Sequence, residues 1–153
     1  MDLKLLRQVD LFRDLDAVQL AHLASFGEEL VLPKGQVLFR EGDPPDFFYV
    51  IQSGRVRISR VVGGMGEEAL AILESGTYFG EMELIDGSLP RAAQATAHEN
   101  IVLAAFNVDT LRELMRGDGE LAVPLLSSFV RTLSERLRMT NDKIAAFFAM
   151  ARF

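Results

Sequence analysis

One arginine stands alone in an acidic part of the chain. Between residues 61 and 111 there are eight Asp and Glu residues and a single cation, Arg91. Pro90 fixes the backbone before Arg91, and the small side chain of Ala92 leaves the backbone amides accessible. A guanidinium fork beside accessible amides suits a phosphate-like anion. The spacing therefore predicts an anion site centred on Arg91.

The second half of this candidate site comes ten residues earlier. Gly80 allows a close backbone approach, and residues 79–85 are predicted to form a turn that opens a short helix. Glu81 would repel a bare phosphate, but its carboxylate can accept a hydrogen bond from a sugar hydroxyl. Gly80, Glu81 and Arg91 together indicate a site for a ribose phosphate. The residues leave one alternative open, in which Glu81 and Arg91 form only an ion pair.

Short strands must position these residues. Apolar runs of three to seven residues recur between Gly and Pro, a pattern typical of an antiparallel sandwich or barrel. The expected strands are 30–32, 37–39, 47–51, 56–62, 69–73, 92–97 and 101–106. Asp16 and Gln19 form a capping-box pattern that predicts a short helix beginning at Asp16 and ending near Gly27.

The chain is expected to be one domain over residues 1–153. We assign residues 1–27 to N-terminal helices, 28–108 to the β-rich part and 109–153 to C-terminal helices. The predicted fold class is α+β and mainly β, namely an antiparallel β-roll or jelly roll (a double-stranded β-helix) with a long C-terminal helix. Pro124 in that helix is tolerable only near its first turn.

The long C-terminal helix carries a heptad pattern. Its apolar positions alternate in steps of four and three, with one polar exception, at Leu126, Val130, Leu133, Leu137, Thr140, Ile144 and Phe147. Two interpretations remain open, a helix that covers the open face of the barrel or a parallel pair of helices in a homodimer, which we expect. The apolar tail, residues 144–153, could extend the dimer helix, fold over a ligand as a lid, bind an effector protein or pack on its own domain.

Composition excludes several function classes. The 153 residues include 16 Lys and Arg against 22 Asp and Glu, two His and no Cys. Disulfide frameworks, thiolate metal sites and a basic footprint for nucleic acid are therefore lacking. His22 and His98 form no His-x-His pair, which argues against a metal-dependent enzyme. Without an apolar run long enough for a membrane span, we expect a cytoplasmic, non-enzymatic protein with no metal, cofactor, nucleic-acid or membrane partner.

The run FGEMELIDGSLPRAA, residues 79–93, resembles the phosphate-binding cassette of cyclic nucleotide-binding domains. The strand and glycine pattern of the chain is also similar to that family, and the resemblance covers about residues 10–145. It implies that Arg91 pairs with the exocyclic oxygens of a cyclic phosphate and that Glu81 accepts from the ribose 2′-hydroxyl. Backbone amides near Gly80 and at Ala92 would complete the cradle.

The resemblance also implies further contacts with the nucleotide. Met82 belongs to the cassette, and Ile58, Leu70 and Leu73 are candidates for the apolar wall around the base, although ordinary barrel core explains each of them as well. In the catabolite-activator branch, two consecutive polar residues of the long helix contact the adenine amino group, one from each subunit. Thr140 and Asn141 occupy the corresponding positions.

These features imply a regulatory module that binds cyclic AMP in preference to cyclic GMP. A Thr directly after the arginine is associated with cyclic GMP in this family, and Ala92 lacks that hydroxyl; Glu83 and Gln94 also depart from the pattern. Occupancy would be coupled to the C-terminal helix and to the dimer. The alternative is a ligand-free dimerisation or scaffold domain of the same fold. Catabolite-activator-like regulators continue into a helix-turn-helix domain, so a chain ending at residue 153 is expected to be the sensor without the DNA-binding part.

Overall fold

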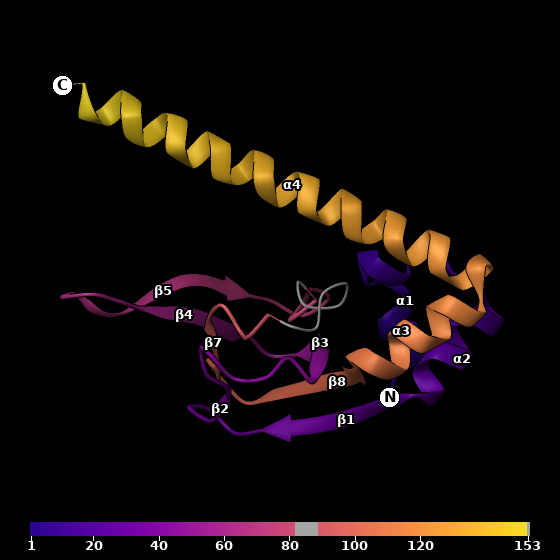
Figure 1. The fold of residues 1–153 in the computed structure, drawn as a ribbon. Coiled ribbons are helices and arrows are strands. Elements are labelled where there is room, and N and C mark those ends of the chain that lie inside the picture. The colour runs from indigo at the N-terminus through magenta and orange to yellow at the C-terminus, as the bar shows by residue number, and fades with distance from the viewer. Residues whose placement is uncertain (82–88, 153) are drawn as a thin grey trace.

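Helices precede and follow the strands in the sequence, and most of them gather at one end of the sheets (Figure 1). The computed structural model describes residues 1–81 and 89–152. The first helices are α1 (Leu3–Arg7), the 3-10 helix η1 (Asp10–Phe12) and α2 (Ala17–Ser25). The strands are β1 (Gly27–Leu32), β2 (Val37–Phe39), β3 (Phe47–Ser53), β4 (Val56–Val62), β5 (Gly66–Leu73), β6 (Tyr78–Phe79), β7 (Gln94–Ala97) and β8 (Ile101–Asn107). The last helices are α3 (Val108–Gly117) and α4 (Gly119–Ala151).

The described strands form two antiparallel sheets of four strands each. One has the order β1-β8-β3-β6 and the other β2-β7-β4-β5. In the first sheet β8 lies between β1 and β3, with Leu30 and Ile51 both opposite Leu103. The predicted antiparallel β-roll with short N-terminal helices and a long C-terminal helix is confirmed. The expected strand over 92–97 is shorter than predicted, because β7 begins at Gln94.

Strand β3 is buried on both faces, which explains its nearly continuous apolar sequence. Phe48 and Val50 belong to a core shared with the helices, and Phe48 stacks on Phe106 with ring centroids 5.1 Å apart. Tyr49 and Ile51, on the opposite face, belong to the core between the two sheets. The alternation places successive residues in different cores because strand side chains point to opposite faces.

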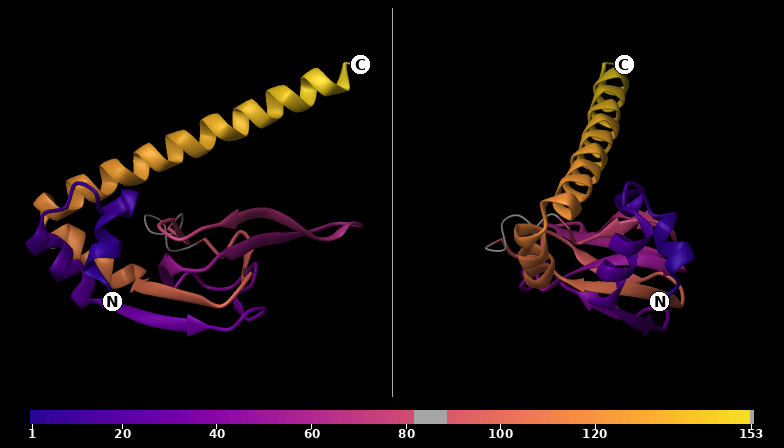
Figure 2. Two further views of the ribbon diagram at one scale, coloured as in Figure 1. Left: turned by 180° about the vertical axis from the view of Figure 1, so that it is seen from behind. Right: turned by 90° about the vertical axis from the view of Figure 1, so that its right-hand side faces the viewer.

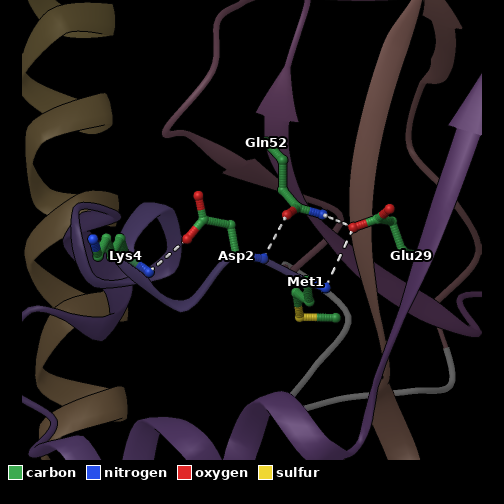
Figure 3. A network of polar contacts seen from close by, with 5 residues as sticks. All are labelled: Met1, Asp2, Lys4, Glu29 and Gln52. Carbon is green, nitrogen blue, oxygen red and sulfur yellow. Dashed lines mark hydrogen bonds and ion pairs between the residues drawn. The ribbon is translucent and has the colours of Figure 1, made fainter.

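The beginning of the chain is fastened to the first sheet (Figure 3). The amino group of Met1 lies 3.6 Å from the carboxylate of Glu29, and the backbone N–H of Asp2 donates to Gln52 at 3.4 Å. Gln52 in turn donates to Glu29 at 3.4 Å, and Asp2 caps α1 through the N–H of Lys4. These contacts fix where α1 lies on the sheet.

A proline in α4 is compensated by a contact from α2. Pro124 is the sixth residue of α4, one turn deeper than the expected position. A proline has no N–H to donate to the carbonyl four residues earlier, here that of Glu120. This carbonyl accepts instead from Nε2 of Gln19 at 3.3 Å. Gln19 also completes the predicted capping box with Asp16, so one side chain begins α2 and ties it to α4.

Helix α4 leaves the rest of the molecule along its course. Its first turns are buried against α3, η1 and the first sheet, where Leu121, Leu125 and Phe129 join the helical core. Figure 2 shows the later turns projecting past the helices, toward the same end as the β4–β5 hairpin. The apolar heptad residues beyond Leu126 are accordingly exposed, with exposed fractions from 46% at Leu133 to 69% at Phe147.

Candidate functional site

A cavity of about 580 Å³ lies where the β-roll meets α4. Its volume is within the range of small-molecule sites, about 300–1,000 Å³. It combines apolar side chains of the second sheet, the end of β6, the residues after Pro90 and one side of α4. The lining residues are Asp10, Phe39, Ile58, Ala71, Leu73, Gly76, Thr77, Tyr78, Phe79, Gly80, Glu81, Arg91, Ala92, Ala93, Thr132, Glu135, Arg136 and Met139.

Arg91 is a buried cation in the wall of this cavity, with 3% of its surface exposed. Its Nη1 donates to the carbonyl of Gly80 at 3.1 Å, and its Nη2 donates to the carbonyl of Phe47. The guanidinium carbon lies 4.2 Å from the ring centroid of Phe39, a cation–π geometry. These contacts hold the side chain of Arg91 in one orientation in the wall of the cavity.

The backbone of Arg91 is fixed by the loop after β2. The N–H of Arg91 donates to the carbonyl of Asp43, and the N–H of Gly42 donates to the carbonyl of Arg91, both at 2.8 Å. Asp43 also accepts from the backbone N–H of Arg40 at 2.9 Å, which closes the loop on itself. The loop around Gly42, between β2 and β3, therefore positions the cation of Arg91.

Gly80 is required because its backbone passes close to Arg91. Its φ is +81°, a conformation that side-chain-bearing residues rarely adopt. A Cβ at this position would lie 2.8 Å from Nη1 of Arg91 and 3.2 Å from the carbonyl of Phe47. The close approach predicted from the sequence is present. It lets the backbone of Gly80 contact Arg91 and line the cavity.

Glu81 is buried at the same wall, and its ion pair reaches across to α4. Its carboxylate Oε1 accepts from Nη1 of Arg136, and Nη2 of Arg136 donates to the carbonyl of Tyr78 at 3.1 Å. The side chain of Glu81 is 3% exposed and that of Arg136 is 41% exposed. Sequence reasoning missed Arg136, although its position one turn after Thr132 and three residues before Met139 puts all three on one face of the helix.

Helix α4 presents different faces to the cavity and to solvent. Thr132, Arg136 and Met139 line the cavity, whereas Thr140 and Asn141 do not and are exposed. The hydroxyl of Thr140 donates to the carbonyl of Arg136 at 2.9 Å, a bond within the helix. At about 100° per residue, the heptad positions lie roughly 110° around the helix from the cavity side. In a single chain, Thr140 and Asn141 are therefore not brought to the site.

The apolar wall agrees with two of the three residues predicted for it. Ile58 and Leu73 line the cavity, and Ala71 lies between them on the paired strands. Leu70 was wrongly expected there: it is 56% exposed and does not line the cavity. Residues three apart on a strand face opposite sides, and Leu70 is the extra residue where Ser59 pairs with Ala69.

The remaining cassette residues are placed in part. Ala92 and Ala93 line the cavity, and Ala92 is exposed. Met82 and Glu83 lie outside the described residues, as does the predicted short helix after Gly80. Gln94 lies at the start of β7, where its side-chain oxygen accepts from Arg40 at 3.4 Å.

Burial in and beside this cavity changes the titration of both tyrosines. Burial raises the pKa of Tyr78, whose ring packs edge-on against Phe129, and the nearby carboxylate of Glu81 acts in the same direction. Burial also raises the pKa of Tyr49, although the Arg91 guanidinium partly opposes this. Both phenols are neutral at physiological pH and contribute hydrogen-bonding or apolar surface, not charge.

The geometry joins a fixed cation, a buried carboxylate, accessible backbone and an apolar wall in one cavity. This combination suits a ligand with an anionic group, a hydroxyl and a flat apolar part. Across residues 1–81 and 89–152, no three His, Cys, Asp or Glu side chains are grouped so as to hold a metal ion. No helix in that part of the chain is long and apolar enough to cross a membrane.

Known proteins with similar sequences and structures share this architecture. The family model described as "Cyclic nucleotide-binding domain" matches residues 29–118. The "CRP-like cAMP-activated global transcriptional regulator" of Mycobacterium tuberculosis is 30% identical over 142 residues, covering 93% of this chain and 61% of that protein. The chain thus spans about three fifths of the length of this curated relative.

Two solved structures extend the similarity to the fold. The N-terminal domain of a transcriptional regulator from Streptomyces coelicolor A3(2) is 36% identical with a TM-score of 0.75, covering 92% of this chain and 94% of that one. A cyclic nucleotide-binding domain from Methylobacillus flagellatus is 28% identical with a TM-score of 0.81, covering 93% and 79%. Since the family model matches more than half of the chain and includes the cassette, the chain belongs to the cyclic nucleotide-binding domain family.

Proposed function

We propose that the chain is a sensor module that binds cyclic AMP in the 580 Å³ cavity and signals its occupancy through α4. One observation carries this proposal: a buried arginine and a buried glutamate stand in the wall of one open cavity beside an apolar surface. Arg91 would pair with the exocyclic phosphate oxygens. Glu81 would accept from the ribose 2′-hydroxyl, and backbone groups at Gly80 and Ala92 would complete the cradle.

The base would lie along the apolar wall. Ile58 and Leu73 face the cavity from β4 and β5, and Met139 faces it from α4. Cyclic AMP is proposed over cyclic GMP because Ala92 offers no hydroxyl to a guanine, and because the relative from Mycobacterium tuberculosis is described as cAMP-activated. Met82 stays proposed as part of the cassette.

The proposed coupling runs from the ribose to α4 through the Glu81–Arg136 pair. A ligand hydroxyl on Glu81 would share that carboxylate with Arg136, which also donates to the carbonyl of Tyr78. Ligand binding can shift α4 only by binding more tightly to one of its positions than to another. Arg136 gives the site a direct means of making that distinction.

A second copy of the chain would cover the heptad face of α4. Val130 and Leu137 are 66% and 62% exposed, as expected for the core positions of a coiled coil when the second helix is not present. In a parallel pair with Leu137 at a core position, Arg136 takes the g position and Asn141 the following e position. Since g and e residues of opposite helices meet, Asn141 of one copy would come next to Arg136 of the other. The homodimer would thus supply the polar residue that a single chain does not.

The competing function is a scaffold of the same fold that binds no ligand. In that scaffold Glu81 and Arg91 would only form an ion pair with each other. The described contacts of Glu81 include Arg136, however, and those of Arg91 include two backbone carbonyls. The proposed module is a binding protein, not an enzyme, and works in the cytoplasm without a metal or cofactor. The exposed tail residues Phe147 and Phe148 are proposed to meet an effector or a following domain.

The test is titration calorimetry of the chain with cyclic AMP and cyclic GMP. Arg91→Lys keeps the charge but loses the fork, and it should weaken binding of cyclic AMP by at least about tenfold, since a bidentate charged contact is lost. Arg55→Lys, on an exposed pair with Glu99, is the matched control and should bind normally. A ligand at 100 times its dissociation constant should also stabilise the fold by about 2.7 kcal/mol. Absence of heat and of thermal stabilisation with both nucleotides would favour the scaffold.

A further inference from the structure

A second hollow lies between α1 and α2. It has a volume of about 400 Å³ and is lined by Leu3, Lys4, Arg7, Gln8, Ala17 and Leu20. We call these six residues the α1–α2 groove. It shares no lining residue with the nucleotide cavity, so it needs an explanation of its own.

The groove combines an apolar floor with a basic rim. Leu20 is almost fully buried, whereas Leu3 is 44% exposed at the edge. Lys4 and Arg7 are three residues apart on α1 and therefore lie on one face of that helix. Neither is in an ion pair with another described residue, whereas the exposed arginines Arg55, Arg57, Arg60 and Arg131 are each paired.

The carboxylates that begin the two helices bind backbone N–H groups, and neither forms an ion pair with Lys4 or Arg7 within the described residues. Asp2 accepts from the backbone N–H of Lys4, and Asp16 accepts from that of Gln19, so both serve as helix caps. Lys4 and Arg7 place two positive charges beside an apolar hollow. The charge and the shape together fit an apolar group that carries a carboxylate nearby.

We propose that the α1–α2 groove docks an acidic, leucine-bearing segment of a partner protein. A leucine side chain would fill the hollow above Leu20, and neighbouring carboxylates would meet Lys4 and Arg7. The hollow, at about 400 Å³, has room for more than one apolar side chain. An occupant longer than one side chain is therefore favoured, and a peptide segment provides this with apolar residues at helical spacing.

The groove is mechanically connected to the helix that lines the nucleotide cavity. Gln19 of α2 donates to the carbonyl of Glu120 in α4, and Arg131 of α4 lies 3.5 Å from Asp14 just before α2. A displacement of α4 would therefore reach the wall of the groove. The docking proposal itself does not depend on the proposed nucleotide binding, because it can be tested without any nucleotide.

The probe is a short fluorescein-labelled peptide, capped at both ends, with Leu at helical spacing and Glu between. Anisotropy titration measures its affinity for the full chain, and methyl NMR locates it. Lys4→Glu combined with Arg7→Glu should weaken binding by at least about tenfold, because two attractive pairs become repulsive. The matched control, Arg13→Glu with Arg116→Glu, makes the same charge change at two exposed positions outside the groove and should bind within about twofold of the original chain.

A second variant keeps the test independent of charge. Ala17→Trp fills the hollow at an exposed position at the start of α2 and should abolish binding, with methyl shifts of Leu3 and Leu20 lost. Equal weakening by the control pair would overturn the proposal by showing non-specific attraction. Peptide shifts confined to the heptad face of α4 would also overturn it. Tight binding of decanoate with no binding of the peptide would replace the partner protein with a fatty acid.

Discussion

Replacing Arg136 by methionine should separate the proposed signalling contact from the proposed phosphate cradle. Arg136→Met keeps the length and apolar stem of the side chain but removes the donors to Glu81 and to the carbonyl of Tyr78. Arg91 and its contacts with Gly80 and Phe47 are untouched. The variant therefore leaves the buried carboxylate in place and withdraws the cation that orients it.

The size of the effect follows from the burial of the two partners. Breaking a fully buried pair costs about 3–5 kcal/mol, and an exposed pair is worth about 0–1 kcal/mol. Glu81 is 3% exposed but Arg136 is 41% exposed, so a loss of about 2 kcal/mol is expected. For a domain of this size that corresponds to a fall in Tm of roughly 4–8 °C.

The decisive assay compares two ligands on two proteins. If Arg136 acts on the ribose through Glu81, Arg136→Met should weaken cyclic AMP by about tenfold, which is about 1.4 kcal/mol. The same variant should change the affinity for 2′-deoxy cyclic AMP by less than about twofold, because the hydroxyl that Glu81 accepts from is absent. Calorimetry on all four combinations measures the coupling. Equal weakening of both ligands would refute this reasoning, since it would mean that Arg136 acts on the site as a whole.

Three further variants or titrations test other parts of the structure. Gly80→Ala should destabilise the fold by about 1–2 kcal/mol and weaken the binding of cyclic AMP. Gly64 also has a positive φ but lies in open space, so Gly64→Ala should destabilise the fold by a similar amount without changing the affinity. Urea unfolding measures the stability of both variants, and calorimetry measures their affinity. Leu137→Glu should abolish a dimer in sedimentation equilibrium, and Ala145→Glu, on another side of α4, should not; a dimer that survives Leu137→Glu would place the interface elsewhere. The chain has two tyrosines, and burial raises the pKa of both, so the native tyrosinate absorbance should titrate above the unfolded value of about 10. Since each folded pKa is the higher one, this contribution to stability is present below pH 10 and is lost as the pH rises through the folded values; native titration at pH 10 or below would contradict the burial of both rings.

Local patterns were sufficient to predict most of the fold. Gly42 and Gly54 lie between expected strands, and both have a positive φ in the structure, a backbone conformation that suits glycine in a turn. The capping box at Asp16 begins α2 as expected. The pairing of β1 with β8 joins residues 69 to 79 positions apart and could not be read from strand patterns alone, because register between distant strands depends on how both faces are packed.

The site was predicted as far as one segment of chain could define it. Gly80, Glu81 and Arg91 lie close in sequence and meet in the cavity. Arg136 was missed because its contact with Glu81 spans 55 residues and depends on the angle at which α4 crosses the sheets. The error at Leu70 had a local cause, since alternation from Leu73 already assigns Leu70 to the outer face, and its 56% exposure agrees with that assignment.

The length of α4 means that any tilt of the helix would displace its far end more than its middle. Its 33 residues span about 50 Å, and Arg136 meets the cavity near the midpoint. If the helix tilts as a rigid rod about its buried first turns, a displacement of about 2 Å at Arg136 becomes about 4 Å at the far end. The ratio between these two displacements depends on where along α4 the ion pair lies. Moving that contact one turn toward the start of α4 would therefore increase the displacement at the far end without any change in the ligand.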